Sequence, residues 1–313
     1  GVAAMFLIGR FNYQSFRPLA RPALYVAIFL LICVLIPGIG ITRNNATRWL
    51  GVGELFTFQP SEIAKVAIVL FFSDSISRKK DKMRTARYGV VPYVIWIGVV
   101  AGLVALEPHL SGAILIAGAG AVLMLVGGIN WGWVIGAISA AGGLLYVVLF
   151  VIGYNTSRIT YWLDPWADPT GAGFQTIQSL YAVASGGLFG LGLGQSRQKT
   201  FIPEAYNDII FAIICEELGL VGAALVILLF AVLIYRGIKI AMRAKDQFGM
   251  LVATGITAVF AFQSIINMGV VTNTIPNTGQ PLPFVSYGGT SLLFLMGMVG
   301  ILLNISRYPK ERD

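Results

Sequence analysis

The chain has 313 residues, of which 57% are hydrophobic and only 12% are charged, and its formal net charge is +8. Soluble domains carry about 25% charged residues, so this composition excludes an ordinary soluble protein and indicates an integral membrane protein. The sequence lacks the alternation typical of barrel strands, and we expect helical spans, because each helix satisfies its own backbone polar groups in lipid. Cys33 and Cys215 lie in apolar stretches and His109 is the single histidine, so neither a disulfide nor a zinc site is expected.

The first nine residues, GVAAMFLIG, are apolar but too short to span a bilayer, for which about 20 residues are needed. We interpret them as the end of a helix that begins upstream, so the N-terminus is expected to be truncated. Eight complete spans are predicted after them, at roughly 23–37, 60–77, 89–106, 110–128, 131–153, 208–234, 248–270 and 288–305. The expected fold is an all-α polytopic helical bundle that forms a single transmembrane domain over residues 1–313.

Basic residues predict the orientation of these spans. Most of the 22 Lys and Arg residues fall in the segments 10–22, 78–88, 235–246 and 306–313, which alternate with less basic segments at every crossing. Loops rich in Lys and Arg face the cytoplasm. We therefore expect these four segments, and the C-terminus with them, to be cytoplasmic.

The opposite face then carries three long segments, 38–59, 154–207 and 271–287. Loops longer than about 15 residues are usually functional or disordered. The segment 154–207 is rich in aromatic residues, and its stretch FQTIQSLYAVAS favours a short helix, so disorder is not expected. Any chemistry is therefore predicted on the extracytoplasmic face.

Asp208, in PEAYNDIIFAIICEELG, is the leading candidate for a catalytic residue. It stands where the polar 154–207 loop meets an apolar span, and acidic residues at such depths are costly to keep. A carboxylate near an acceptor hydroxyl, with water largely excluded, suits a general base. The structural alternative is helix capping by Asn207 or Asp208. Glu216 and Glu217 follow on the same helix, and we interpret them as buried structural acids, with a proton relay as the alternative.

Two further patterns place cations beside this face. Glu62 and Lys65, in QPSEIAKVAIVLFF, share one helix face; either they form a structural ion pair, or Lys65 faces a cavity and meets an anionic substrate group. The glycine-rich run SGGLFGLGLGQSRQK ends in Arg197 and Lys199. Flexible backbone followed by two cations suits a pyrophosphate, although the run lacks the Walker A pattern, and a plain flexible loop is the alternative.

The remaining polar groups of this face come from three short motifs. Arg48, in NNATRWLGVG, either binds a phosphate through its guanidinium or snorkels to the interface. Glu107 and His109 lie in LEPHLSG, where the histidine is interpreted as a packed polar residue, and Ser286 lies in PFVSYGGTS.

These motifs occur in an order that resembles the FtsW/RodA/SpoVE family, the SEDS group of shape, elongation, division and sporulation proteins. The stretches that carry the resemblance are TRWLGVG, FTFQPSEIAK, LEPHLSGAIL, YWLDPWADPTGAGFQTIQSLYAVASGGLFGLGLGQSRQK, PEAYNDIIFAIICEELG, LPFVSYGGTSLL and GILLNISR. The resemblance covers essentially the whole chain, and DPWADPTGAG and NDIIFAIICEELG are closer to the FtsW and SpoVE branch than to RodA. It implies ten membrane helices in the complete protein, of which this chain begins late in the second.

The resemblance further implies a peptidoglycan glycosyltransferase of the bacterial cytoplasmic membrane that polymerises lipid II for division or sporulation. Asp208 matches the essential aspartate of the family, Glu62 and Lys65 its QPSE-x-x-K pair, and Arg48 the arginine of its RRW-like motif. The implied partners are lipid II, a class B penicillin-binding protein, divisome or sporulation proteins and membrane lipid, with no nucleic acid.

The expected reaction is one inverting displacement, in which Asp208 accepts the proton of the acceptor sugar's 4-hydroxyl and undecaprenyl pyrophosphate leaves. Candidate residues for binding lipid II and its pyrophosphate are Arg48, Glu62, Lys65, Glu107, Arg197, Lys199 and Ser286. No cofactor is certain from the sequence, and a divalent cation, Mg²⁺ or Mn²⁺, is the one candidate. Two alternative functions remain open, a lipid II flippase and a non-catalytic scaffold for a transpeptidase, although no internal repeat of the transporter type is evident.

Overall fold

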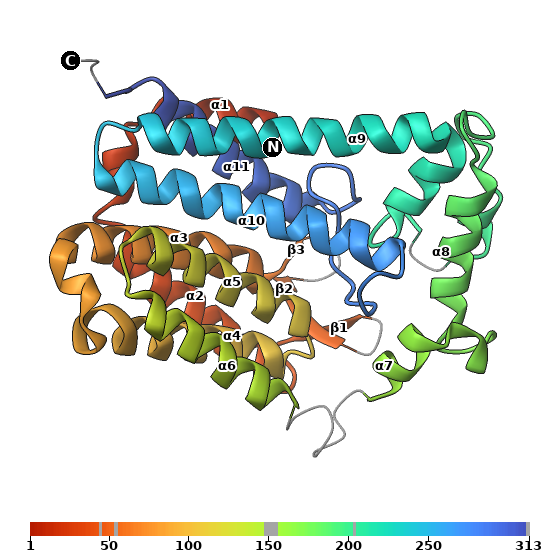
Figure 1. The fold of residues 1–313 in the computed structure, drawn as a ribbon, viewed down its shortest axis with the longest axis horizontal. Coiled ribbons are helices and arrows are strands. Elements are labelled where there is room, and N and C mark those ends of the chain that lie inside the picture. The colour runs from red at the N-terminus through yellow and green to blue at the C-terminus, as the bar shows by residue number, and fades with distance from the viewer. Residues whose placement is uncertain (44–45, 53–55, 147–155, 203–204, 311–313) are drawn as a thin grey trace. The chain divides into compact units, whose positions relative to one another are not determined.

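The computed structural model describes residues 1–43, 46–52, 56–146, 156–202 and 205–310 (Figure 1). The chain divides into two compact units. Unit 1 comprises residues 1–134, 234–262 and 288–313, and unit 2 comprises residues 135–233 and 263–287. Both units are built mainly from helices. This confirms the predicted all-α class, whereas the extent of the predicted single domain stays a prediction.

Every predicted span coincides with a helix, although residues 147–153 of the fifth span lie outside the described residues. The helices are α2 (Ala20–Leu35), α3 (Pro60–Lys79), α4 (Val91–Leu106), α5 (Leu110–Val126), α6 (Trp131–Tyr146), α9 (Ile210–Arg243), α10 (Gln247–Val271) and α11 (Gly289–Ser306). The short apolar start of the chain is α1 (Val2–Ile8). Among the described residues, four helices are long and apolar enough to cross a membrane, namely Ala86–Leu106, α9, α10 and α11.

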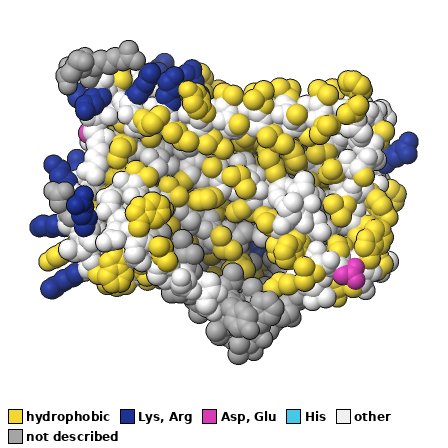
Figure 2. Space-filling model, viewed as in Figure 1, with side chains coloured by type: hydrophobic (Ala, Val, Ile, Leu, Met, Phe, Trp, Pro, Cys, Tyr) yellow, Lys and Arg dark blue, Asp and Glu magenta, His cyan; other side chains and the backbone are white. Residues whose placement is uncertain are grey.

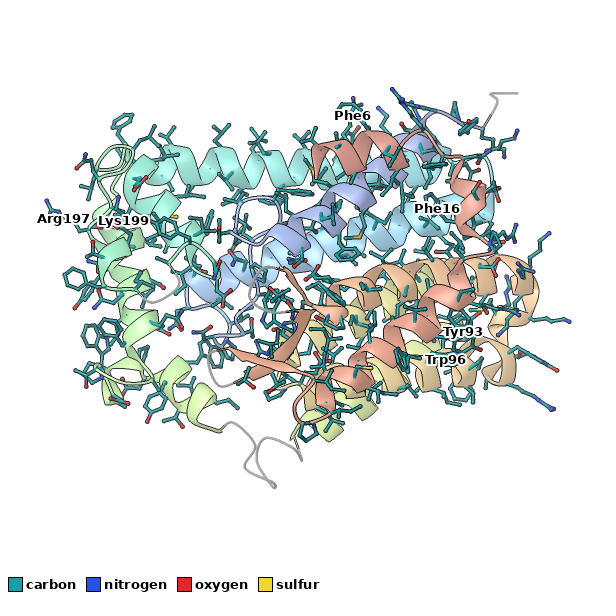
Figure 3. All side chains as sticks on the ribbon, turned by 180° about the vertical axis from the view of Figure 1, so that it is seen from behind. Phe6, Phe16, Tyr93, Trp96, Arg197 and Lys199 are labelled. Carbon is teal, nitrogen blue, oxygen red and sulfur yellow. The ribbon has the colours of Figure 1, made fainter. Side chains whose placement is uncertain are left out.

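Helix α3 is the central helix of unit 1. Pro60 occupies its first turn, where a missing N–H costs nothing, and Arg78 and Lys79 in its last turn complement the helix dipole. The Phe72 ring on α3 packs edge-on against Tyr93 of α4 at 4.9 Å. Tyr93 and Trp96 are labelled on α4 in Figure 3. α3 is buried along most of its length, so it carries charged residues inside protein rather than in lipid.

The predicted cytoplasmic segments converge at one end of unit 1. The carboxylate of Asp74 accepts hydrogen bonds from Arg17 at 2.7 Å and from Arg78 at 2.8 Å, which joins the segment 10–22 to the end of α3. The backbone N–H of Lys310 donates to the carbonyl of Arg243 at 2.8 Å, which joins the last two basic segments. Figure 2 shows most of the visible Lys and Arg side chains at this end. The clustering agrees with the alternation of basic loops in the sequence.

The segment 38–59 contains an antiparallel sheet that the sequence did not predict. Its strands are β1 (Ile41–Arg43), β2 (Ala46–Val52) and β3 (Phe56–Phe58), in the order β1-β2-β3. Leu50 of β2 lies opposite Phe58 of β3. Thr, Trp, Val and Phe favour strands, but runs this short carry little signal beside membrane-length helices.

Unit 2 holds the large loop and the beginning of α9. The loop contains α7 (Thr156–Leu163) and α8 (Phe174–Ser185), and α8 coincides with the short helix predicted from FQTIQSLYAVAS. A core of buried apolar side chains joins α8, the start of α9 and the loop after α10. It comprises Ala182, Ile202, Ala205, Ile209, Phe211, Ala212, Ile213, Cys215, Ala223, Phe230, Val271 and Leu282. α9 is broken at Gly219, whose φ is 66° and ψ −163°, a break that the sequence did not predict.

Candidate functional site

Asp208 lies half-buried in the turn directly before α9, which begins at Ile210. Its neighbours Ile209 and Phe211 belong to the apolar core of unit 2 and hold this turn in place. A carboxylate near the N-terminus of a helix is stabilised by the helix dipole. The sequence therefore folds so that an acid is fixed at the start of the short helical segment 210–218, which the break at Gly219 separates from the longer part of α9.

Asn267 of α10 ties Asp208 to the loop that follows α10. Its side-chain amide donates to the backbone carbonyls of Asp208 and Gln280, each at 2.7 Å. Asn267 is fully buried, and Gln263, one turn earlier, donates to the carbonyl of Pro281 at 3.1 Å. Buried carbonyls left without a donor would cost free energy, so these two amides determine where the segment 279–281 lies beside Asp208.

Gly279 brings bare backbone up to the carboxylate of Asp208. Its φ of 62° lies in the left-handed region that disfavours side chains, and a Cβ built on it would stand 3.1 Å from Oδ2 of Asp208. One face of the carboxylate therefore lies against glycine. The sequence reading missed both Asn267 and Gly279. The signals available were an asparagine inside an apolar helix and the glycine of the NTGQP turn.

Ser286 lies close to this site, and its hydroxyl holds backbone. It donates to the carbonyl of Asn207 at 2.6 Å and accepts from the N–H of Leu282 at 2.7 Å. The N–H of Tyr287 also donates to the carbonyl of Tyr206 at 2.9 Å. These bonds attach the loop after α10 to the residues just before Asp208. A role for Ser286 in binding lipid II stays a prediction.

The glycine-rich run packs its backbone into the break of α9. Before the break, the carbonyls of Glu216 and Glu217 accept from the N–H groups of Leu191 and Gly192, at 2.9 and 3.0 Å. After it, the N–H groups of Leu220 and Val221 donate to the carbonyls of residues 187 and 188, at 2.9 and 3.2 Å. A Cβ on Gly190 would stand 2.2 Å from the carbonyl oxygen of Glu217, so glycine is required for this approach.

Glu216 is a buried structural acid, as the sequence analysis favoured. Its carboxylate accepts hydrogen bonds from the Ser196 hydroxyl at 2.5 Å, the Arg197 N–H at 3.1 Å and the Gln198 N–H at 3.2 Å. A carboxylate that receives several N–H and O–H donors is well solvated by protein. Glu216 thereby fixes the end of the glycine-rich run, and the N–H groups of Arg197 and Gln198 are directed at it.

Arg197 and Lys199 project from this same run (Figure 3). The Lys199 ammonium lies 3.6 Å from Oε1 of Glu217 and donates to the carbonyl of Gly194, whereas the Arg197 side chain is exposed. Lys199 and Glu217 line a pocket of about 300 Å³ whose apolar wall includes Ile213, Ile214 and Leu218. Tyr206 and Ile210, two positions either side of Asp208, line the same pocket.

Unit 1 holds a second polar cluster, in which β2, the start of α3 and the turn between α4 and α5 meet. Arg48 of β2 donates through Nε to the carbonyl of Glu107 at 3.2 Å and through a terminal nitrogen to the carbonyl of Pro108. The amide of Gln59 lies 3.2 Å from Nδ1 of His109. Arg48 therefore fastens the α4–α5 turn to the sheet.

Glu62 and Lys65 form a buried ion pair in this cluster, with 2.8 Å between Oε1 and the ammonium. Both side chains are almost fully buried, and a buried charge is tolerated only when it is paired. The ion pair predicted from the spacing is therefore present, and a direct contact of Lys65 with substrate stays a prediction.

Burial also controls the charge of Glu107 and His109. Glu107 is fully buried, and both its carboxylate oxygens lack a hydrogen-bond partner within the described residues. Burial raises the pKa of Glu107 to about 8, although Arg48 opposes the shift. Burial lowers the pKa of His109 to about 3, and the charges of Arg48 and Lys65 act in the same direction. His109 is a neutral packed residue at neutral pH, as its sequence context indicated.

The family model described as "Cell cycle protein" (FTSW_RODA_SPOVE) matches residues 1–311. The chain belongs to the FtsW/RodA/SpoVE family. It is 45% identical over 312 residues to Stage V sporulation protein E of Bacillus subtilis (strain 168), covering 99% of this chain and 85% of that protein. It is 41% identical over 308 residues to the probable peptidoglycan glycosyltransferase FtsW of Geobacter sulfurreducens (strain DL-1 / KN400), covering 98% of this chain and 82% of the relative.

Solved structures of FtsW/RodA/SpoVE proteins have the same fold. The chain matches the rod shape determining protein RodA of Thermus thermophilus with a TM-score of 0.71 and 25% identity, covering 98% of this chain and 84% of that one. It matches a chain from the structure titled "Structural coordination of polymerization and crosslinking by a peptidoglycan synthase complex" with a TM-score of 0.81 and 27% identity, covering 97% and 85% of the two chains. The predicted resemblance and the polytopic membrane fold are both confirmed.

In this FtsW/RodA/SpoVE chain the predicted site residues fall into two groups. Unit 1 holds Arg48, Glu62, Lys65 and Glu107, and unit 2 holds Asp208, Arg197, Lys199 and Ser286. Within the described ranges, no three His, Cys, Asp or Glu side chains come together in a way that would hold a metal ion. Among the described residues, the donor set around Asp208 therefore offers no ready-made Mg²⁺ or Mn²⁺ site.

Proposed function

We propose that this chain polymerises lipid II into glycan strands, with Asp208 as the general base at the outer face of the bacterial cytoplasmic membrane. The enzyme class, a peptidoglycan glycosyltransferase, is the one that curated relatives at about 40% identity carry in their names. One observation supports the role of Asp208 above the others. The core of unit 2 holds its turn at the start of the helical segment 210–218, and its carboxylate lies against the backbone of Gly279.

The reaction requires one proton acceptor and stabilisation of a leaving diphosphate. The carboxylate of Asp208 removes the proton from the 4-hydroxyl of the acceptor sugar as that oxygen attacks the anomeric carbon of the lipid-linked donor. The bond from the anomeric carbon to the pyrophosphate oxygen breaks in the same step, so the configuration inverts from α to β. Undecaprenyl pyrophosphate leaves with the bonding electrons.

Cations that contact the substrate stabilise the charge that develops on the pyrophosphate, a contribution that is usually the largest in such reactions. Lys199 is the candidate in unit 2, because it lines a pocket with Tyr206 and Ile210, the residues that flank Asp208 by two positions. Arg197 is exposed on the same run. In unit 1, Arg48 and Lys65 are the candidates, and Glu62 holds the Lys65 ammonium. A divalent cation would supply further positive charge, with substrate phosphates completing its ligand set.

Charge placement supports an extracytoplasmic active site and a cytoplasmic C-terminus. Arg236, Lys239 and Arg243 lie at the C-terminal end of α9, and Asp208 lies just before its N-terminal end. Basic segments face the cytoplasm, so this charge pattern supports the assignment of Asp208 to the other side of the membrane. The partner on that side is a class B penicillin-binding protein, whose transpeptidase would crosslink the new strands, within the division or sporulation machinery.

Reconstitution in liposomes tests this function against its alternatives. Purified protein is supplied with lipid II, with and without the transpeptidase partner. Glycan polymer is measured on gels, and movement of labelled lipid II between leaflets is measured in parallel. The proposal predicts polymer from the wild type and none from Asp208→Ala, with lipid II binding retained. Lipid movement without polymer, sensitive to Lys65→Met but not to Asp208→Ala, would indicate a flippase. Neither activity, with intact transpeptidase recruitment, would indicate a scaffold.

A further inference from the structure

Residues 187–193, here called the apolar loop, expose large hydrophobic side chains outside any helix. Leu188 is 62% exposed, Phe189 81% and Leu193 76%. Isolated exposed apolar residues are common on proteins, but a contiguous apolar group marks an interaction surface. The apolar loop is part of the glycine-rich run of unit 2. The proposed reaction uses neither Leu188 nor Phe189, and Leu193 stands at its end, where it also lines the pocket beside Lys199.

The backbone of the apolar loop is bonded to α9 on both sides of its break. Four hydrogen bonds of 2.9–3.2 Å join residues 187, 188, 191 and 192 to residues 216, 217, 220 and 221. In lipid, each unsatisfied backbone group costs several kcal/mol, so non-helical backbone is tolerated at membrane depth only where other backbone or protein satisfies it. The break at Gly219 frees backbone N–H and carbonyl groups of α9, and these satisfy the backbone of the apolar loop.

The apolar surface of the loop continues that of α9. Leu220 is 61% exposed, Val221 57% and Leu225 55%, directly after the break. α9 is long and apolar enough to cross a membrane, and the rest of the protein covers only a minor part of its apolar stretch. These side chains therefore face lipid. Because Val221 is bonded to the carbonyl of Leu188, the loop lies beside this lipid-facing surface.

The depth at which the apolar loop meets α9 in the membrane follows from the length of the helix after the break. From Leu220 to Arg236 the helix rises about 24 Å at 1.5 Å per residue, which is less than the ~30 Å thickness of the hydrocarbon core. With Arg236 held at one edge of that core, Leu220 lies inside the opposite edge. Arg197, which is exposed shortly after the loop, has the charge expected beside lipid phosphates.

We propose that the apolar loop dips into the bilayer beside α9, with the side chains of Leu188, Phe189 and Leu193 in lipid and Arg197 near the headgroups. The large outer loop thus returns to the membrane surface before the chain reaches Asp208. The partner is the lipid bilayer itself, and this assignment does not depend on the proposed reaction. A transpeptidase or a second copy of the chain covering the loop is the competing occupant.

Site-directed spin labelling of the full chain in liposomes tests the proposal. Single cysteines replace Phe189, Leu193, Leu228 or Gln195 in a background with Cys33→Ala and Cys215→Ala, because these are the free cysteines of the chain. Leu228, 58% exposed on α9, is the lipid-facing control, and Gln195, exposed in the same run, is the water-facing control. Relaxation of each nitroxide by oxygen, which partitions into lipid, is compared with relaxation by an aqueous Ni²⁺ chelate.

We expect the ratio of oxygen to Ni²⁺ accessibility to exceed one at positions 189 and 193, as at 228, and to fall below one at 195. A ratio below one at 189 and 193 would place the apolar loop in water and overturn the proposal. Low accessibility to both reagents would also overturn it, since the loop would then be covered by protein. The label at position 228 reports in each preparation whether α9 has inserted and folded.

Discussion

The substitution Gly279→Ala tests how closely the backbone of the loop after α10 supports Asp208. Gly279 has a φ of 62°, and its new Cβ would stand 3.1 Å from Oδ2 of Asp208. A non-glycine residue in the left-handed region costs about 1–2 kcal/mol. At 3.1 Å the carboxylate must also yield by a few tenths of an ångström. Since a ~1 Å misplacement of reacting groups costs about a hundredfold in rate, we expect this smaller shift to lower turnover roughly threefold to tenfold.

The matched control is Gly128→Ala. Gly128 also has a left-handed φ, of 91°, but its Cβ would meet nothing within 4 Å. Both variants carry a similar backbone cost, and only Gly279→Ala contacts the carboxylate. The assay measures the initial rate of lipid II polymerisation over a range of lipid II concentrations, together with the thermal unfolding temperature of each protein.

We expect both variants to unfold at a slightly lower temperature and only Gly279→Ala to lose turnover, with little change in the lipid II concentration that gives half-maximal rate. Equal rates in the two variants would show that the carboxylate does not need the space that glycine leaves. A rate loss that followed stability alone, in both proteins, would refute the reasoning in the same way.

Three further predictions concern Glu107, Asn267 and Glu216. Burial raises the pKa of Glu107 in the folded protein from its ordinary 4.5 to about 8, so the folded protein holds a proton that the unfolded chain releases, and stability falls as pH rises between these two values. The lowered pKa of His109 opposes this trend only below about pH 6.5. Between pH 6.5 and 8, the unfolding temperature should therefore fall in the wild type and stay level in Glu107→Gln. Parallel curves of unfolding temperature against pH for the two proteins would exclude a protonated Glu107. Asn267→Leu removes the donor to the carbonyls of Asp208 and Gln280. It should cost ~1–3 kcal/mol of stability and lower turnover more than it lowers lipid II affinity. Unchanged turnover would show that α10 does not position Asp208. Glu216→Gln replaces the charged acceptor of the Ser196 hydroxyl and of the Arg197 and Gln198 N–H groups, so trypsin should cut faster after Arg197 and Lys199 than in the wild type, and equal cutting would argue against Glu216 as the anchor.

Much of the fold was predictable because its signals are local. Membrane-length apolar runs predicted the helices, and the alternation of basic segments agrees with their convergence at one end of unit 1. The helix α8 follows from its own composition. By contrast, the break at Gly219 depends on backbone from residues 187–192, which are far away in sequence. A glycine indicates a permissive position, but it does not show which segment will occupy the gap.

The candidate site was predictable in its side chains and not in its backbone contacts. Asp208 and the pair of Glu62 with Lys65 were evident because charges inside apolar helices are costly. Two donors to the Glu216 carboxylate are backbone N–H groups, which every residue except proline carries. The other two are the hydroxyls of Ser185 and Ser196, and no residue pattern identified any of the four. Gly279 was missed for a similar reason, since its role is to leave space beside a carboxylate more than seventy residues earlier.

The most direct test of the account is the rate of lipid II polymerisation by Asp208→Asn, measured beside lipid II binding by the same protein. Asparagine keeps the size and polarity of the side chain and removes its capacity to accept a proton. If Asp208 is the general base, lipid II affinity should match that of the wild type, and the initial rate should fall by about 10²–10⁴-fold, the usual contribution of such a group. A rate close to that of the wild type, with binding intact, would contradict the central claim.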